Sequence, residues 1–189
     1  SQSALPNVRL RVLYELVARI TYLDGDHLLD VTGQAIAESL PFSVLYIVLE
    51  RENGSPTLFA RTSEGPCPPG NVAVSRSLIN KCRNEGVAIL AGNGADQDPS
   101  LDRTAVFQSL KSAMCVPLLS HGKSFGVVYA SSPSESVYSR EDLQFLILVA
   151  SNVVHKLSAT RAIQVVQGEK EKLETILGSL QEGVVLLDE

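Results

Sequence analysis

The chain has 189 residues, of which 44% are hydrophobic, and this is enough to bury one substantial core. Its net charge of −5 gives no basic surface for a phosphate backbone, which argues against direct binding of nucleic acid. No secretory, transit or membrane-spanning segment is visible in the sequence, and the unfinished apolar run at its end suggests a fragment of a longer protein.

The first two predicted elements are amphipathic helices. Within residues 8–23, apolar side chains recur at steps of three and four: Leu10, Leu13, Leu16, Val17 and Ile20. Asp26 is the predicted N-cap of a second helix, and Pro41 marks its end. Two helices joined by so short a turn are suited to covering one face of a sheet.

A hairpin and a crossing loop follow. Residues 43–50 and 57–62 are rich in β-branched and aromatic side chains, and Asn53-Gly54 between them favours a reversal. Three prolines and two glycines within residues 63–71 mark a loop that crosses to the other face of the sheet. Residues 72–83 carry apolar side chains at helical spacing, and Gly86 is suited to end that helix.

The next stretch contains little predicted sheet. A short strand at residues 87–91 leads into a polar, glycine-bearing loop at residues 92–100 and then into a short helix at residues 103–110 that includes Phe107. Because such loops on a rigid scaffold are the usual place for ligand recognition, we expect ligand contacts here.

Residues 112–131 predict a second, central hairpin whose strands are apolar enough to be covered on both faces. Pro117 cannot donate a hydrogen bond to a neighbouring strand, so the first strand should be interrupted or unpaired on one side there. Gly126 in the second strand suggests a bulge or a close backbone approach.

A long helix ends the chain. Ser139 and Asp142 are spaced as a capping box at its start. Beyond Leu157 the apolar residues form a narrow seam with steps of four and three, typical of a heptad repeat. The seam consists of Ala159, Ile163, Val166, Lys170, Leu173, Leu177 and Leu180. Because one core position is lysine, a dimeric coiled coil and a single solvated helix both remain open.

The chemistry-bearing residues are dispersed. Cys67, Cys82 and Cys115 form an odd, widely spaced set, which indicates neither a disulfide framework nor paired metal ligands and fits a reducing, cytoplasmic compartment. The three histidines are equally scattered and suggest no metal site. We find no nucleophile elbow, phosphate-binding loop or paired acid and base, so we expect no enzymatic activity, and these residues identify no cofactor.

The order of these elements resembles that of a GAF domain. The stretches that carry the resemblance are residues 10–16, residues 86–91 with 96–98, residues 112–118 and residues 126–129. It implies an α+β fold in which a six-stranded antiparallel sheet has the N- and C-terminal helices on one face. Loops and short helices would cap a small-molecule pocket on the other face.

The end of the chain shows a second resemblance, because residues 172–189 are similar to the helix and first strand that open a PAS domain. The expected organisation follows in four parts: residues 1–7 as a leading segment, residues 8–160 as the GAF domain, residues 161–180 as a helical signalling linker and residues 181–189 as the start of the PAS domain.

The resemblance implies a regulatory sensor from a bacterial, multidomain signalling protein that forms a homodimer through its terminal helices. A small molecule or an upstream signal would shift the arrangement of those helices and so reach downstream PAS and output domains. The fold does not name the ligand. Cyclic-nucleotide-binding members carry an Asn-Lys, Phe, Asp-Glu motif around the pocket, but Asn80-Lys81 lies in a different element and Phe107 is not followed by an Asp-Glu pair. Neither Cys82 nor Cys115 has the surrounding motif of a bilin attachment site.

The expected pocket lies between the central hairpin, the helix with Ser75 and Cys82, and the loop helix with Phe107. The candidate pocket residues are Tyr46, Arg61, Ser75, Cys82, Phe107 and Cys115. Alternation puts Ala113 on one face of the hairpin and Met114 on the other, and sequence alone does not say which faces the pocket. The alternative function is a ligand-free dimerisation spacer, in which Phe107 and Met114 would pack the pocket shut.

Overall fold

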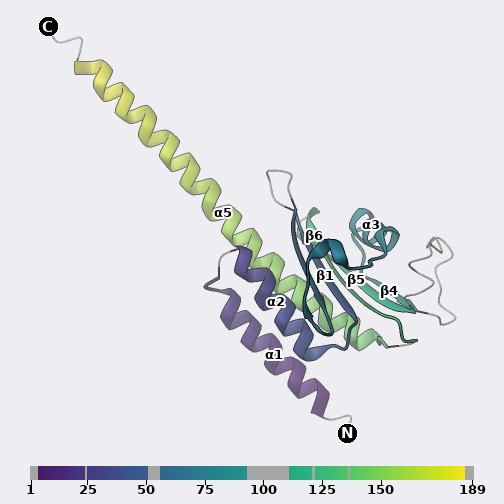
Figure 1. Ribbon diagram of the computed structural model, residues 1–189. Helices are drawn as coiled ribbons and strands as arrows, with labels where there is room; N and C mark the ends of the chain where they lie inside the picture. The colour runs from purple at the N-terminus through teal and green to yellow at the C-terminus, as the bar shows by residue number, and fades with distance from the viewer. Residues whose placement is uncertain are drawn as a thin grey trace. The chain divides into compact units, whose positions relative to one another are not determined.

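The structure is a computed structural model, shown in Figure 1, and it describes the following residues: 4–23, 25–50, 56–92, 111–120, 122–135 and 137–185. The chain divides into two compact units, Ser1–His155 and Lys156–Glu189. The predicted loop after the fourth strand and the predicted helix with Phe107 lie outside the described residues.

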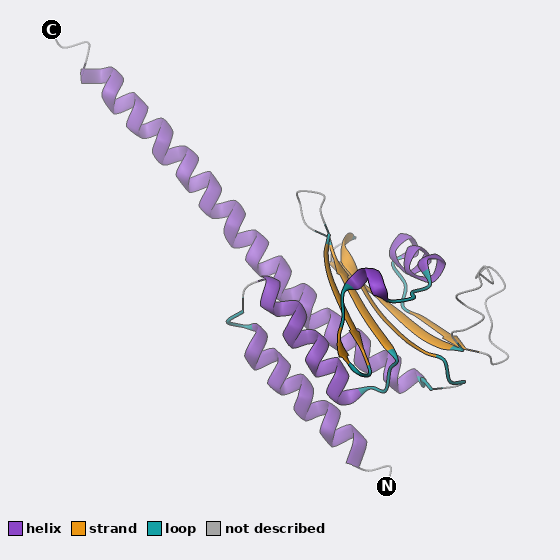
Figure 2. Ribbon diagram, viewed as in Figure 1, coloured by secondary structure: helices purple, strands orange, loops and turns teal. Residues whose placement is uncertain are grey.

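A six-stranded antiparallel sheet forms the centre of the first unit, as predicted, with the strand order β3-β2-β1-β6-β5-β4 (Figure 2). Its strands are β1 (Val44–Leu49), β2 (Thr57–Thr62), β3 (Gly65–Pro66), β4 (Ile89–Gly92), β5 (Ser112–Ser120) and β6 (Lys123–Ser132). The two-residue strand β3 lies within the predicted crossing loop, where too few residues pair to leave a sequence pattern.

Helices cover both faces of this sheet. They are α1 (Ala4–Ile20), α2 (Gly25–Ser39), the 3-10 turn η1 (Pro69–Asn71), α3 (Arg76–Glu85) and α5 (Arg140–Val185). In Figure 1, α1, α2 and the part of α5 that belongs to the first unit lie on one side of the sheet, and α3 lies on the other. The helix α2 begins at Gly25, one residue before its predicted cap.

Alternation along β1 shows how the two faces differ. Leu45, Ile47 and Leu49 are buried beneath the helices, whereas Tyr46 and Val48 are half-buried on the α3 side. Full burial of one such aliphatic side chain stabilises the fold by roughly 1.5–3 kcal/mol, so the helix-covered face supplies much of the stability.

The outer face of α1 corrects one sequence prediction. The helix buries Val12, Leu16 and Ile20 at steps of four, whereas Leu10 and Val17, which were predicted to share the buried face with Leu16, are 68% and 42% exposed. The helix therefore has two apolar stripes, and the spacing of one does not exclude the other.

The pairing of the central hairpin shows how Pro117 is accommodated in a strand. The strand β5 runs through Pro117, which lies opposite Val127 of β6, while β4 pairs only with residues 112–115 of β5. Among the described residues, β5 therefore has no paired strand on one side at Pro117, as predicted. This arrangement tolerates a residue without a backbone N–H.

The helix α5 continues through Val185, although the PAS resemblance predicted a strand among the last residues, and residues 186–189 lie outside the described chain. By length and composition, Arg140–Ser179 contains a stretch apolar enough to cross a membrane. Phe145, Leu146 and Val149 within this range are buried in the first unit. Core helices of folded domains often pass the same test, so this finding is weak evidence for a membrane span.

Candidate functional site

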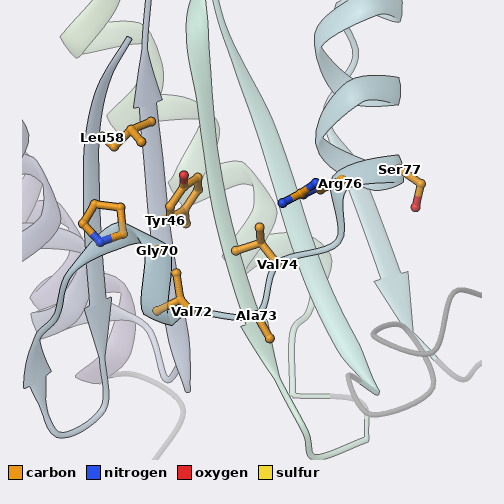
Figure 3. A pocket seen from close by; sticks show the side chains of 9 residues that line it. Tyr46, Leu58, Gly70, Val72, Ala73, Val74, Arg76 and Ser77 are labelled. Carbon is orange, nitrogen blue, oxygen red and sulfur yellow. The ribbon is translucent and has the colours of Figure 1, made fainter.

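A cavity of about 500 Å³ lies on the α3 side of the sheet, between β1, β2 and the segment that leads from η1 into α3 (Figure 3). The described residues that line it are Tyr46, Leu58, Pro69, Gly70, Val72, Ala73, Val74, Arg76 and Ser77. Seven of these nine residues belong to the segment 69–77, so this segment forms most of the wall.

The local sequence explains why this segment runs across the sheet. Proline at position 69 favours the tight turn of η1, and the chain leaves that turn extended at Val72, with φ −111° and ψ 137°. Ser75 then caps α3, and its Oγ accepts a hydrogen bond from the Leu78 amide at 3.4 Å. The Ser75 amide donates to the Tyr129 hydroxyl of β6, also at 3.4 Å, which ties the end of the segment to the sheet.

The sheet register supplies the rest of the wall. Tyr46 lies opposite Tyr129 of β6 and opposite Ala60 of β2, and Leu58 lies opposite Val48. Tyr46 and Val48 are two residues apart on one strand, so both project from the α3 face. Tyr46 and Leu58 consequently provide an aromatic and an aliphatic surface beneath the segment (Figure 3).

The central hairpin does not line this cavity. The pocket predicted between the hairpin, α3 and the helix with Phe107 stays a prediction, because that helix lies outside the described residues. The Ala113 and Cys115 side of the hairpin faces α3, so the orientation that the sequence left open is now defined. However, α3 packs directly on that side and forms an apolar cluster with it. The buried members of the cluster are Leu78, Cys82, Ala91, Ala113, Cys115, Val127 and Tyr129. The cavity lies instead over the neighbouring strands β1 and β2.

The predicted candidates therefore separate into groups. Tyr46 lines the cavity, and Ser75 is buried between two lining residues as the cap of α3. Cys82 of α3 and Cys115 of β5 lie together where the helix packs on the sheet, and both are fully buried. These residues share one face of the sheet, but only Tyr46 reaches the cavity.

Arg61 lies on the opposite face, where its Nη1 donates a hydrogen bond of 3.1 Å to Oε1 of Gln34 in α2. It does not line the cavity, because its strand position has the parity of the helix-covered face, opposite Leu45. Phe107 lies outside the described residues. Sequence reasoning missed Val72 and Arg76, although the proline-rich crossing loop before them was a signal for the segment.

The buried cysteines are poor candidates for chemistry. The hydrogen bond with Cys82 and, to a smaller extent, burial raise the pKa of the Cys115 thiol well above its ordinary value of 9.0. A protonated, buried thiol is a weak nucleophile. Among the described residues, no group of three or more His, Cys, Asp or Glu side chains could hold a metal ion.

Two buried tyrosines also hold their protons tightly. Burial raises the pKa of Tyr129, although the hydrogen bond from the Ser75 amide partly opposes the effect. Burial raises the pKa of Tyr138 further, and its hydroxyl has no hydrogen-bond partner within the described chain. The folded protein therefore disfavours ionisation of these hydroxyl groups.

We expect stability to fall at alkaline pH. These pKa values are higher in the folded state, so the unfolded chain loses protons first once the pH passes the ordinary values of 9.0 for cysteine and 10.0 for tyrosine. Each group that ionises only in the unfolded chain should reduce the unfolding free energy by about 1.4 kcal/mol per pH unit. Urea titrations from pH 7 to 11 would measure this slope. Tyr138→Phe should make it shallower, and an unchanged slope would contradict this assignment.

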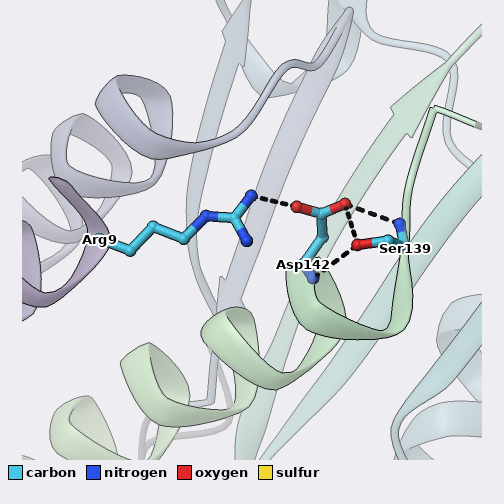
Figure 4. Close-up of polar contacts among 3 residues, drawn as sticks. All are labelled: Arg9, Ser139 and Asp142. Carbon is cyan, nitrogen blue, oxygen red and sulfur yellow. Dashed lines mark hydrogen bonds and ion pairs between the residues drawn. The ribbon is translucent and has the colours of Figure 1, made fainter. Parts of the chain in front are cut away.

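A polar contact joins the first helix to the start of the last one, on the helix-covered face (Figure 4). The Asp142 carboxylate accepts hydrogen bonds from the amide and hydroxyl of Ser139 at 2.7 and 2.8 Å, and the Asp142 amide donates to the Ser139 hydroxyl. This confirms the predicted capping box. The other carboxylate oxygen pairs with Arg9 of α1, whose guanidinium lies 5.6 Å from the Phe145 ring centre.

Comparisons with known proteins identify the fold. Residues 23–157 match the sequence profile of the GAF domain. No curated protein matches the chain. Among solved structures, the GAF domain of an Acinetobacter phosphoenolpyruvate-protein phosphotransferase has a TM-score of 0.61 at 18% identity, covering 83% of this chain and 96% of that one.

Two further structures show the range of proteins with this fold. Free methionine-R-sulfoxide reductase from Neisseria meningitidis, in complex with its substrate, has a TM-score of 0.60 at 18% identity, covering 82% of this chain and 91% of that one. Residues 122 to 287 of a methyl-accepting chemotaxis protein have a TM-score of 0.61 at 16% identity, covering 78% of this chain and 98% of that fragment. At these identities the likeness concerns the fold alone.

Proposed function

Because the chain belongs to the GAF domain family, we propose that its first unit is a sensor that binds a small molecule in the described cavity. The observation that carries this proposal is the cavity itself, whose volume of about 500 Å³ lies in the range of small-molecule sites. Its lining combines apolar walls with a few polar groups, which is the usual composition of such sites.

The strands offer a short route from the cavity to the helices. Tyr46 lines the cavity, and its neighbours Leu45 and Ile47 are packed beneath the helices on the other face of β1. A ligand that moves Tyr46 therefore acts one residue away from the helical layer. In our proposal the ligand shifts an equilibrium between two helix arrangements, by the difference in its affinity for them.

The alternative function is a spacer that binds nothing. It required Met114 and Phe107 to close the pocket, but Met114 is absent from the cavity lining and from the cluster beneath α3. It is fully buried, and its place in β5, next to Cys115, puts it on the helix-covered face. This position favours the sensor over the spacer.

A metabolite screen by thermal unfolding tests the sensor directly. A ligand at a concentration a hundredfold above its Kd should raise the Tm by roughly 5–10 °C, because it binds only the folded state. Val72→Trp, which puts an indole into the cavity, should abolish the shift. Val87→Trp is the matched control, because Val87 is 46% exposed and lies outside the cavity lining. A screen without any shift, or equal shifts in both variants, would contradict the proposal.

We further propose that the sensor acts as a parallel homodimer through its terminal helices. The described residues of the second unit form a single helix, whose seam residues Ile163, Val166, Leu173 and Leu177 are each about 60% exposed. An isolated helix gains little stability in water, and an apolar heptad seam is complementary to a second copy of itself. Leu10 and Tyr14 of α1 add exposed apolar surface in the first unit.

Two adjacent valines provide a matched test of the dimer. Val166 belongs to the seam and Val165 does not, yet both are similarly exposed, at 65% and 60%. Val166→Asp should weaken dimerisation by at least about tenfold, because it puts two like charges into the seam, whereas Val165→Asp should have little effect. Sedimentation velocity at micromolar concentration measures both. A monomeric parent chain would refute the dimer, and equal effects would refute this seam.

Our proposal extends to the surroundings of the unit. We infer a cytoplasmic, bacterial signalling protein in which α5 leads to a PAS module and an output domain. The PAS module is inferred from the similarity of residues 172–189 to a PAS opening, of which the helical part agrees with α5. We also infer that the unit is not an enzyme. This inference rests on the buried, protonated state of the Cys115 thiol and on its separation from the cavity lining.

A further inference from the structure

Among the described residues that line the cavity, Arg76 is the one charged side chain, and it is exposed to solvent. Arg76 is the first residue of α3, and in Figure 3 its guanidinium extends from the start of that helix toward Tyr46. Within the described parts of the chain, it has no carboxylate or hydrogen-bond partner. The preceding and following described arginines do have partners: Arg61 donates a hydrogen bond to Gln34, and Arg83 forms an ion pair with Glu50 at 3.1 Å.

The remainder of the lining is mainly apolar. Tyr46, Leu58, Val72 and Val74 provide an aromatic ring and aliphatic walls beside the guanidinium. No acidic side chain is present among the lining residues that the structure describes. A ligand with an apolar body and one negative group would therefore satisfy both parts of the cavity.

The backbone amides at the start of α3 also favour a negatively charged ligand group. The Ser75 hydroxyl oxygen accepts a hydrogen bond from the Leu78 amide, and the Ser75 carbonyl oxygen accepts one from the Ile79 amide. The amides of Arg76 and Ser77 are the first two of the helix, and helix geometry leaves them without an intrahelical acceptor. They add a small positive potential at the cavity wall, which reinforces the charge of the arginine side chain.

Arg76 is the one cationic side chain among the described lining residues, and this limits the negative charge that the ligand should carry. A guanidinium matches one carboxylate through two parallel hydrogen bonds, whereas a doubly charged phosphate group is usually held by several cationic groups. The chain has a net charge of −5, which further disfavours a polyanion. We propose that the cavity binds a small organic monocarboxylate, with its apolar or aromatic body against Tyr46 and Leu58 and its carboxylate on Arg76. This proposal rests on the proposed sensor function and specifies its ligand class.

A panel of matched acids and amides tests the ligand class, for example 3-phenylpropionate with 3-phenylpropionamide and indole-3-acetate with indole-3-acetamide. Calorimetry or ligand-observed NMR would give the affinity of each pair for the full chain. We expect the best acid to bind at least about tenfold more tightly than its amide, as charge-assisted hydrogen bonds are the stronger ones. Arg76→Gln should reduce the acid to the affinity of the amide and leave the amide unchanged.

Arg83→Gln is the matched control, because it removes the same charge from the other end of α3, away from the cavity lining. It should leave the preference for the acid intact. Equal binding of acids and amides, or neutral compounds binding where acids do not, would overturn the carboxylate assignment while the sensor function stands. A loss of preference in Arg83→Gln as large as in Arg76→Gln would also overturn it. If no compound of this panel or of the metabolite screen binds, the sensor function itself fails.

Discussion

Replacing Gly126 by alanine is expected to destabilise the first unit by at least about 3 kcal/mol. Gly126 lies in β6 with φ +138°, a conformation that side chains rarely adopt. An added Cβ would overlap the carbonyl oxygen of Val48 and lie 2.8 Å from its carbon and 3.1 Å from the Cα of Leu49. These are backbone atoms of the paired strand β1, so they cannot rotate away as a side chain would. Urea unfolding followed by circular dichroism measures the loss.

Gly168→Ala provides the control for this substitution. Gly168 lies in α5, and a Cβ added there meets no atom within 4 Å. Alanine favours a helix by about 1 kcal/mol over glycine, so this variant should be as stable as the parent chain or slightly more stable. A Gly126→Ala variant that unfolds at the same urea concentration as the parent would show that β1 and β6 do not approach as described.

The close approach at Gly126 illustrates what the sequence can predict. A glycine inside an apolar strand pattern indicated either a bulge or a backbone contact, and the structure contains both features close together. The approach to Val48 occurs at Gly126 itself, and the β5–β6 register shifts between Leu118 and Leu119. Local chemistry was sufficient because only glycine tolerates this geometry. The capping box at Ser139 and the helix stop at Gly86 were predictable for the same reason.

The candidate site was less predictable, because it depends on contacts between distant parts of the chain. The sequence predicted that residues 63–71 would cross to the other face, but it did not indicate over which strands they would lie. The cavity therefore lies over β1 and β2 rather than over the central hairpin. Cys115 and Tyr46 lie in similar apolar strands and project from the same face of the sheet, yet α3 covers only Cys115. The local sequence does not indicate this difference.

The face of a half-buried strand is also hard to assign from sequence. Arg61, which lies in the predicted second strand, was a candidate pocket residue. Its neighbour Ala60 is buried and lies opposite Tyr46, whereas Arg61 lies opposite Leu45 and reaches Gln34 on the helical side. A shift of one residue exchanges the two faces, so small errors in register move a candidate across the sheet.

The contact between α1 and α5 leads to the second large effect. Asp142→Ala is expected to destabilise the first unit by about 3 kcal/mol, because it removes the buried partner of Arg9 and one half of the capping box. The Asp142 side chain is only 10% exposed and that of Arg9 is 19% exposed, so solvent screens this pair weakly. Ser139→Ala is the control, since it removes the hydroxyl of the cap and leaves the ion pair, and it should cost about 1 kcal/mol.

A double-mutant cycle isolates the ion pair itself. Arg9→Met keeps the length of the side chain over Phe145 but removes its charge, so it should cost about 1–2 kcal/mol in the parent and much less once Asp142 is alanine. A coupling energy of about 1–2 kcal/mol would show that α1 and the start of α5 are linked through this carboxylate. Because the sensor is proposed to act through these helices, loss of the link should also reduce the effect of a cavity ligand on dimerisation. Strictly additive losses of stability would mean that the two helices are held together without it.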